Sequence, residues 1–411
     1  MMTLGKNRSW RSTFFLFFSA LLLSFSGYVE QSFLDHSSEL RAIAIIAFSL
    51  LVFFISLVFI KKIQNIGFFH ILLVFFMLYG SIVGVLRGNI IEIFSPFFRL
   101  FLFLMVSLLV YNFLKSDKHF TQRAIAIFLG WCSFFIVVQT FYEVIIGGGI
   151  FMNNAVRYYG SITSPIGFAS LAFTLLCGLG YCWVLLGGRL KFLLLLGLVW
   201  VVLMTSTRSI SAMSFLVMWL LIVFRLQLGM TFLWLAVTPL LGWGAIIALQ
   251  DVGVWERIVS TVNDAELDGS SSFRVFILDN FFMHLDAGNL FFGLGLGYFH
   301  VWFQSVTSVP GVAPHFEWLW ILSEFGLILF LIYMAYGLSY LVLSFYKWQA
   351  GQIDRCGFLI VIFFSMTPQF FLQLANPFYF YQVVIVFGII AGIALNYSEL
   401  ANFKIFGKVS L

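Results

Sequence analysis

The chain has 411 residues, of which 62% are hydrophobic, 20% aromatic and only 9% charged, with a mean hydropathy of +1.04 and a net charge of +5. Soluble proteins carry about 25% charged residues, and a soluble domain of this size cannot hide so much apolar surface. The composition therefore excludes a soluble enzyme, a nucleic-acid-binding domain and a disordered chain, and it predicts a polytopic membrane protein.

Apolar runs of about 17–25 residues predict transmembrane helices. No β-type alternation is present, so a membrane barrel is not expected. We therefore predict an all-α polytopic fold, with a single integral membrane domain over residues 1–411 and about twelve spans. The spans are 13–29, 42–60, 68–86, 100–114, 124–146, 165–187, 190–206, 209–224, 229–249, 316–345, 357–375 and 378–396.

The first apolar run has two readings. Lys6, Arg8 and Arg11 precede it, as basic residues precede the apolar core of a secretory signal peptide. The residues after it contain no clear small-x-small cleavage site. We therefore expect an uncleaved first helix.

The basic residues predict the orientation, because loops on the cytoplasmic side carry an excess of Lys and Arg. With the N-terminus inside, fifteen basic and three acidic residues fall on the inner side, against seven basic and fourteen acidic residues on the outer side. The bias predicts that both termini are cytoplasmic, and it assigns the basic excess to topology rather than to a nucleic-acid partner.

This topology leaves one large outer loop, residues 250–315. Within it, residues 272–285 (SFRVFILDNFFMHL) predict a mostly apolar helix, begun by Arg274 and capped by Ser270 or Ser271. Such a helix is expected to lie on the bilayer or against the bundle. A long loop with structure of its own usually carries function.

Three arginines are predicted on the outer side, where basic residues are disfavoured: Arg157, Arg208 and Arg274. Each can be an interfacial side chain or half of a structural ion pair. Alternatively, their planar guanidinium groups can clamp the pyrophosphate of a lipid-linked sugar. Neither an Asp-x-Asp pair nor a His cluster with metal spacing accompanies them, so we expect no metal.

The cysteines are not expected to form a disulfide or a metal site. All four cysteines lie in or beside predicted spans and none lies in the large loop, so neither a disulfide nor a zinc framework is implied. They are expected to be small buried hydrophobic residues. The four are Cys132, Cys177, Cys182 and Cys356.

His315 is the second candidate for chemistry. Pro314 favours a helix start there, and the dipole of a helix N-terminus keeps an imidazole neutral and available as a base. The alternative is a satisfied interfacial histidine. Glu324 falls on the opposite face of that helix, so we expect it to form a structural bond to another helix, and Gly326 to allow a close helix contact.

Four segments resemble motifs of the O-antigen polymerase and ligase superfamily, in the order of that family. They are residues 157–165 (RYYGSITSP), 206–209 (STRS), 289–299 (NLFFGLGLGYF, preceded by Arg274) and 315–326 (HFEWLWILSEFG). The predicted topology places all four on the outer side. The resemblance covers residues from about 155 to 330.

The resemblance implies GT-C-like architecture and metal-independent glycosyl transfer at the periplasmic face of a bacterial inner membrane. The donor and acceptor would be glycans on undecaprenyl pyrophosphate, without a cofactor. By position, Arg208 and Arg274 would bind the pyrophosphate, and His315 would deprotonate the acceptor hydroxyl. The predicted substrate-binding residues are Arg157, Tyr159, Gly295, Glu317 and Trp318.

The resemblance leaves alternatives within the family and outside it. Ligases commonly begin the last motif with His-Asn, whereas Phe316 follows His315 here, and no Trp stands four residues after Arg274. These departures favour a polymerase, with a chain-length regulator protein as a further expected partner, over a ligase that transfers the chain to lipid A-core. A transporter is the rival from another class, although transporters usually place polar residues at the membrane midplane.

Overall fold

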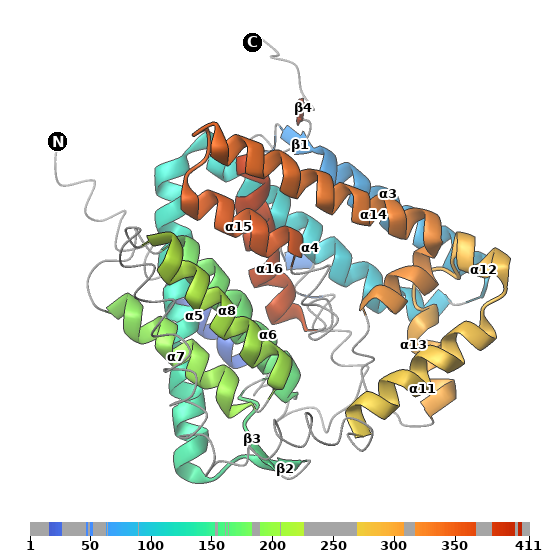
Figure 1. The fold of residues 1–411 in the computed structure, drawn as a ribbon, viewed down its shortest axis with the longest axis horizontal. Coiled ribbons are helices and arrows are strands. Elements are labelled where there is room, and N and C mark those ends of the chain that lie inside the picture. The colour runs from blue at the N-terminus through green and yellow to red at the C-terminus, as the bar shows by residue number, and fades with distance from the viewer. Residues whose placement is uncertain are drawn as a thin grey trace.

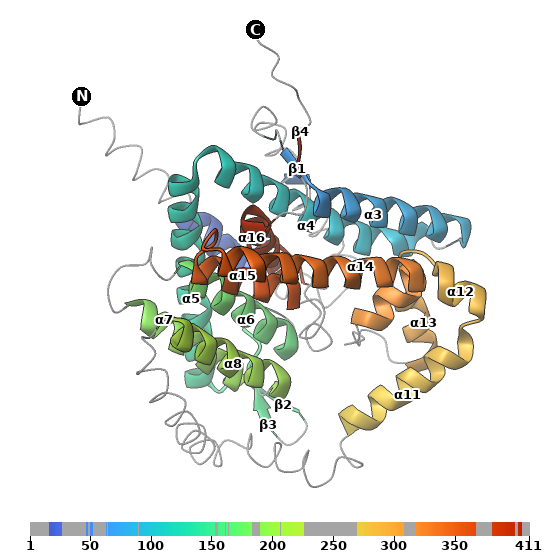
Figure 2. The same ribbon diagram turned by 45° about the horizontal axis from the view of Figure 1, so that its top comes forward.

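The computed structural model shows a bundle of helices, with α11 (Gly269–His284), α12 (Ala287–Phe292) and α13 (Tyr298–Thr307) together at one side of it (Figure 1 and Figure 2). The described residues are 16–26, 47, 50–51, 63, 65–88, 90–152, 155–160, 162, 164–182, 190–205, 207–225, 269–307, 317–366, 380–398 and 402–404. Helices account for most of them, which confirms the predicted all-α class.

The elements follow one another with short connections in several places. Their order is β1 (Asn65–Gly67), α3 (Phe68–Leu86), α4 (Ile90–Ser116), α5 (Lys118–Ile146), β2 (Ile150–Met152), β3 (Ala155–Arg157), α6 (Pro165–Tyr181), α7 (Leu190–Met204), α8 (Arg208–Arg225), α11 (Gly269–His284), α12 (Ala287–Phe292), α13 (Tyr298–Thr307), α14 (Glu317–Gln349), α15 (Arg355–Met366), α16 (Tyr381–Ser398) and β4 (Asn402–Lys404). The strands pair antiparallel, β1 with β4 and β2 with β3.

Four of the described helices are long and apolar enough to cross a membrane, judged by length and composition: Phe68–Leu86, Ile90–Ser116, Lys118–Ile146 and Trp318–Gln349. Shorter apolar helices, such as Leu16–Ser26 and Tyr381–Tyr397, accompany them. These helices indicate a membrane-embedded protein. The number of twelve spans is not established, because 229–249 and most of 42–60 lie outside the described residues.

The predicted fourth span, 100–114, is too short. Helix α4 begins ten residues earlier, at Ile90, and contains Pro96. Polar residues interrupt the apolar pattern there, and two of them pair within the helix, since Nη2 of Arg99 donates to Oγ of Ser95 at 2.6 Å. An intrahelical partner of this kind cannot be read from hydropathy.

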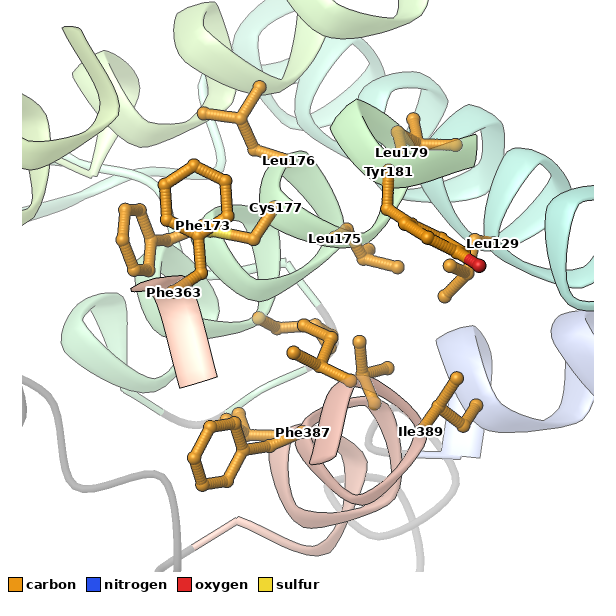
Figure 3. Close-up of a cluster of buried hydrophobic side chains, with 14 of the residues drawn as sticks. Leu129, Phe173, Leu175, Leu176, Cys177, Leu179, Tyr181, Phe363, Phe387 and Ile389 are labelled. Carbon is orange, nitrogen blue, oxygen red and sulfur yellow. The ribbon is translucent and has the colours of Figure 1, made fainter. Parts of the chain in front are cut away.

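Helix α16 lies inside the bundle and packs closely along α4. Small residues make this possible: a Cβ at Gly388 would lie 3.0 Å from Val106, and one at Gly392 only 2.6 Å from the carbonyl oxygen of Ser107. Figure 3 shows buried side chains of α6, α15 and α16 in one cluster, with Leu129 of α5 beside Tyr181 of α6.

Helices α4, α6 and α16 run in the same direction. Phe103 stacks on Phe387 with centroids 5.2 Å apart, and one end of the same helix pair is joined by Asn396, whose amide donates to the carbonyl of Tyr111 at 3.1 Å. At the opposite end of α16, Phe380 contacts Gly167 in the first turn of α6. The N-termini of α6 and α16 therefore lie at the same end of the bundle.

Helices α8 and α14 run in the same direction as α4, α6 and α16. Gly180 of α6 approaches Leu221 of α8, and both residues lie near the C-termini of their helices. The hydroxyl of Tyr340 in α14 donates to the carbonyl of Ala394 in α16. The helices that follow motifs 157–165 and 206–209 thus begin at the end where α14 begins, and we call this the motif end of the bundle.

We expect Gly392→Leu to destabilise the protein by about 1–3 kcal/mol, because a side chain there overpacks the contact with α4. The thermal unfolding midpoint in detergent micelles measures the change. Gly288→Ala in α12 is the matched control, since the nearest atom to its Cβ would be 3.4 Å away. Equal midpoints for both variants would contradict the close packing of α4 on α16.

Candidate functional site

The first two motif segments meet at the motif end of the bundle. The β2–β3 hairpin ends at Arg157, and the next backbone N–H, that of Tyr158, donates to the carbonyl of Met204 at 3.1 Å. Met204 is the last residue of α7, so the segment after Arg157 lies against the α7–α8 junction. Motifs 157–165 and 206–209, about fifty residues apart in sequence, are therefore neighbours, and we call them the first motif pair.

Buried hydroxyl groups hold the α7–α8 junction. Thr205 Oγ1 donates to the carbonyl of Val202 at 2.6 Å and lies 2.7 Å from Oγ1 of Thr207. Helix α8 begins at Arg208, and Ser211 donates twice to the carbonyl of Thr207, through its backbone N–H at 2.9 Å and its hydroxyl at 2.8 Å. The predicted junction at Arg208 is confirmed for the backbone, whereas its side chain lies outside the described part.

Glu143 holds the loop between β3 and α6 in place. This role was not predicted from the sequence. Its side chain is only 6% exposed, and Oε2 accepts a hydrogen bond from the backbone N–H of Gly160 at 3.0 Å. Gly160 has φ +54, and a Cβ there would meet the ring of Phe168. The available signal was a lone carboxylate near the end of the apolar run 124–146.

Arg157 is the buried cation of the first motif pair. It is 6% exposed, and its Nε and Nη2 find no hydrogen-bond partner among the described residues. An uncompensated buried charge costs several kcal/mol, so an anion at these nitrogens would be strongly favoured. The N-termini of α6 and α8, whose dipoles also favour negative charge, lie at the same end.

The last two motif segments also meet. Residues 293–297, which we call the glycine loop, lie against α14 near Gly326, where the helix is interrupted by φ +79 and ψ +169. The backbone N–H groups of Leu294 and Gly295 donate to the carbonyls of Ser323 and Glu324 at 2.7 and 3.0 Å. Motifs 289–299 and 315–326 thus form a second motif pair.

The three glycines of the glycine loop leave no room for a Cβ atom. A Cβ at Gly293 would lie 2.6 Å from the carbonyl oxygen of Glu324, and one at Gly297 would lie 2.7 Å from that of Glu92 in α4. Gly295 is pressed against the backbone of Gly84 in α3. Gly295 therefore has a packing role in this structure, and its predicted contact with substrate stays a prediction.

The predicted structural bond of Glu324 to another helix is confirmed. Its carboxylate is 1% exposed, and Oε1 accepts hydrogen bonds from the backbone N–H groups of Gly297 and Phe299, at 2.9 and 3.3 Å. Gly297 immediately precedes α13, and Phe299 lies in its first turn. The predicted close contact at Gly326 is confirmed as well, although Gly326 interrupts the helix rather than lying in a straight one.

Polar side chains join α12 to the C-terminal part of α3 and to the residue that follows it. Nη2 of Arg87 donates to Oδ1 of Asn289 at 2.6 Å, and the hydroxyl of Tyr79 donates to the carbonyl of Phe292 at 2.5 Å. Burial raises the pKa of Tyr298 above its ordinary value, and the positive charge of Arg87 opposes that rise. Tyr298 therefore stays protonated at neutral pH and is available as a hydrogen-bond donor.

The predicted helix in the large loop is confirmed, with two corrections. Helix α11 begins at Gly269, so Ser270 and Ser271 lie in its first turn rather than at a capping position before it. Arg274 lies in the second turn rather than at the start. The residues just before 272 are serines rather than apolar residues, so the apolar pattern did not reveal that the helix begins at Gly269.

The structure describes some of the remaining predicted site residues and not others. His315 lies outside the described residues, and α14 begins two residues later, at Glu317, whose side chain is not described. Trp318 is partly buried, with its ring 6.3 Å from that of Phe330 and its indole N–H without a partner among the described residues. Tyr159 is partly exposed in the loop after β3. The roles of these residues stay predictions.

The described residues add no candidate site for metal binding or for thiol chemistry. Within the described ranges, His, Cys, Asp and Glu nowhere gather in a group of three, and the expectation of no metal stays a prediction for the whole chain. Cys132, Cys177 and Cys182 are buried and unpaired, which confirms their interpretation as small core residues.

Comparison with known proteins adds no relative. No family model, no curated protein and no solved structure matches the chain with significance.

We expect Arg157→Gln to raise the stability of the ligand-free protein by about 1–3 kcal/mol, because it removes a buried charge without a described partner. The same variant should lose the stabilisation that inorganic pyrophosphate confers on the wild type, which reaches about 2.7 kcal/mol at 100 times Kd. Thermal unfolding in detergent micelles, with and without pyrophosphate, measures both effects.

Arg123→Gln is the control for this experiment. Arg123 is exposed near the start of α5, at the opposite end of the bundle from Arg157. Pyrophosphate should stabilise this variant as it does the wild type. An equal response of the Arg157→Gln and Arg123→Gln proteins would rule out an anion site at Arg157.

Proposed function

We propose that this protein is an O-antigen polymerase, which joins undecaprenyl-pyrophosphate-linked repeat units into a long polysaccharide. In this proposal the motif end of the bundle faces the periplasm and the protein resides in the bacterial inner membrane. The observation that supports it is the pairing of the four motif segments at one end of the bundle. An accidental resemblance gives no reason for distant segments to meet in this way.

The chemistry of the paired segments suits a lipid-pyrophosphate donor. Arg157 offers two guanidinium nitrogens without described partners, and Arg208 begins a helix beside it. Guanidinium groups and helix N-termini stabilise the charge that develops on a departing pyrophosphate. Arg274, carried by α11, is the third proposed cation.

In the proposed reaction, the acceptor hydroxyl attacks the anomeric carbon of the donor. The bond between that carbon and the pyrophosphate oxygen breaks, and undecaprenyl pyrophosphate leaves with the electron pair. His315, just before α14, accepts the proton of the hydroxyl. Arg157, Arg208 and Arg274 hold the leaving group, while Tyr159, Glu317 and Trp318 contact the sugars.

We expect Arg208→Ala, Arg274→Ala and His315→Ala each to abolish long-chain polysaccharide, because losing one group that stabilises a transition state lowers a rate by about 100- to 1,000-fold. The test is complementation of the gene deletion in the native host, with chain length read on a gel and protein abundance in membranes read by immunoblot. Arg123→Ala, an exposed arginine at the opposite end, is the control and should restore full chain length. Normal chains from all three site variants would refute the proposal.

Two null strains separate polymerase from ligase. A polymerase should restore a ladder of chain lengths in a strain that lacks only its polymerase. Transfer of repeat units to lipid A-core in a strain that lacks only its ligase would instead identify a ligase. Both strains must make the native repeat unit, because enzymes of this type are expected to be selective for their sugars.

A further inference from the structure

The interruption of α14 creates a need for hydrogen bonds. In a continuous helix the carbonyls of Ser323 and Glu324 accept from N–H groups four residues later. The non-helical dihedral angles of Gly326 interrupt that pattern. The glycine loop takes over the two carbonyls, since Leu294 and Gly295 donate to them. The loop and the break in α14 therefore satisfy each other.

The carboxylate of Glu324 extends this contact to α13. Glu324 lies two residues before the break at Gly326. Its carboxylate accepts hydrogen bonds from the backbone N–H groups of Gly297 and Phe299. A carboxylate at a helix N-terminus pairs with groups that have no partner inside the helix and with the positive end of the helix dipole. Helix α13 is thus held at its N-terminus by a side chain of α14.

Helix α13 in turn holds α11. Phe281 of α11 meets Trp302 of α13 with ring centroids 5.3 Å apart, and Trp302 stacks on Phe299 at 5.6 Å. Ile277, one turn after Arg274, belongs to the same buried cluster, as does Leu319 of α14. The buried cluster therefore connects the start of α13 to the helix that carries Arg274.

We infer that Glu324 is a positioning residue that fixes the helix carrying Arg274 relative to the helix that follows His315. The inference rests on the proposed function only in the roles of those two residues. Glu324 lies two turns after the start of α14, is 1% exposed and binds the start of α13 through Oε1, so in this inference it acts through the other two residues rather than by touching substrate. Displacement of a catalytic group by about 1 Å is enough to cost about 100-fold in rate.

The direct test is the distance between α11 and α14, measured by double electron–electron resonance in lipid nanodiscs. Spin labels at Asp279→Cys and Ile332→Cys occupy exposed positions on the two helices, while Cys132, Cys177 and Cys182 are buried and Cys356 is replaced by Ser. Glu324→Ala should broaden the distance distribution. Glu324→Gln keeps a carbonyl oxygen in place and should retain the narrow distribution.

A matched control and a second readout complete the experiment. Glu92→Gln changes an exposed carboxylate in the first turn of α4 at the same end, and should leave the distances unchanged. In the native host, Glu324→Ala should shorten the polysaccharide as an approximately 100-fold loss of rate would, and Glu324→Gln should rescue it in large part. If Glu324→Ala does not fold, Glu324→Asp, whose carboxylate is one methylene shorter, replaces it in both measurements.

The outcomes separate the two proposals. An unchanged distance distribution in a folded Glu324→Ala or Glu324→Asp protein overturns the positioning role, whatever the protein polymerises. A broadened distribution supports that role, even if Arg208→Ala, Arg274→Ala and His315→Ala all leave chain length normal and so refute the polymerase. Broadening together with shortened chains, and rescue of both by Glu324→Gln, supports the inference in full.

Discussion

A break in the last long helix is the constraint on which much of the described structure depends. Backbone groups away from water must be paired within the protein, and the interruption at Gly326 deprives α14 of its own pairing. The glycine loop meets this need because Gly293, Gly295 and Gly297 let backbone approach backbone. The positions of α12, α13 and α11 follow from that contact, and so does the position of Arg274 on α11.

The few charges of this protein fall into two kinds. Glu143 and Glu324 are buried carboxylates that each accept a backbone hydrogen bond through one oxygen and so hold a loop and a helix in place, although Oε2 of Glu324 has no hydrogen-bond partner among the described residues. Arg157 is equally buried, yet two of its nitrogens have no described partner. Carboxylates with backbone partners stabilise the fold, whereas a buried cation without a described partner is a candidate for binding an anion.

Local patterns predicted the helices well where one apolar run had clean ends, as for 68–86, which coincides with α3. They failed where a polar side chain finds its partner inside the helix, as Arg99 does, and where serines extend α11 beyond its apolar part. The need of Glu324 for a partner was predictable, because an intramembrane carboxylate is costly. The identity of that partner and the importance of Glu143 were not, because both depend on residues distant in sequence.

The sequence by itself determined the membrane-embedded, helical class, because 9% charge cannot cover a soluble surface, and it marked the four motif segments. Only the tertiary structure decided that these segments meet as two pairs, and that Arg157 is buried while two of its nitrogens lack described partners. The physical reason is that composition and periodicity are properties of single segments. The pairing of buried polar groups, in contrast, depends on which distant segments share the same interior.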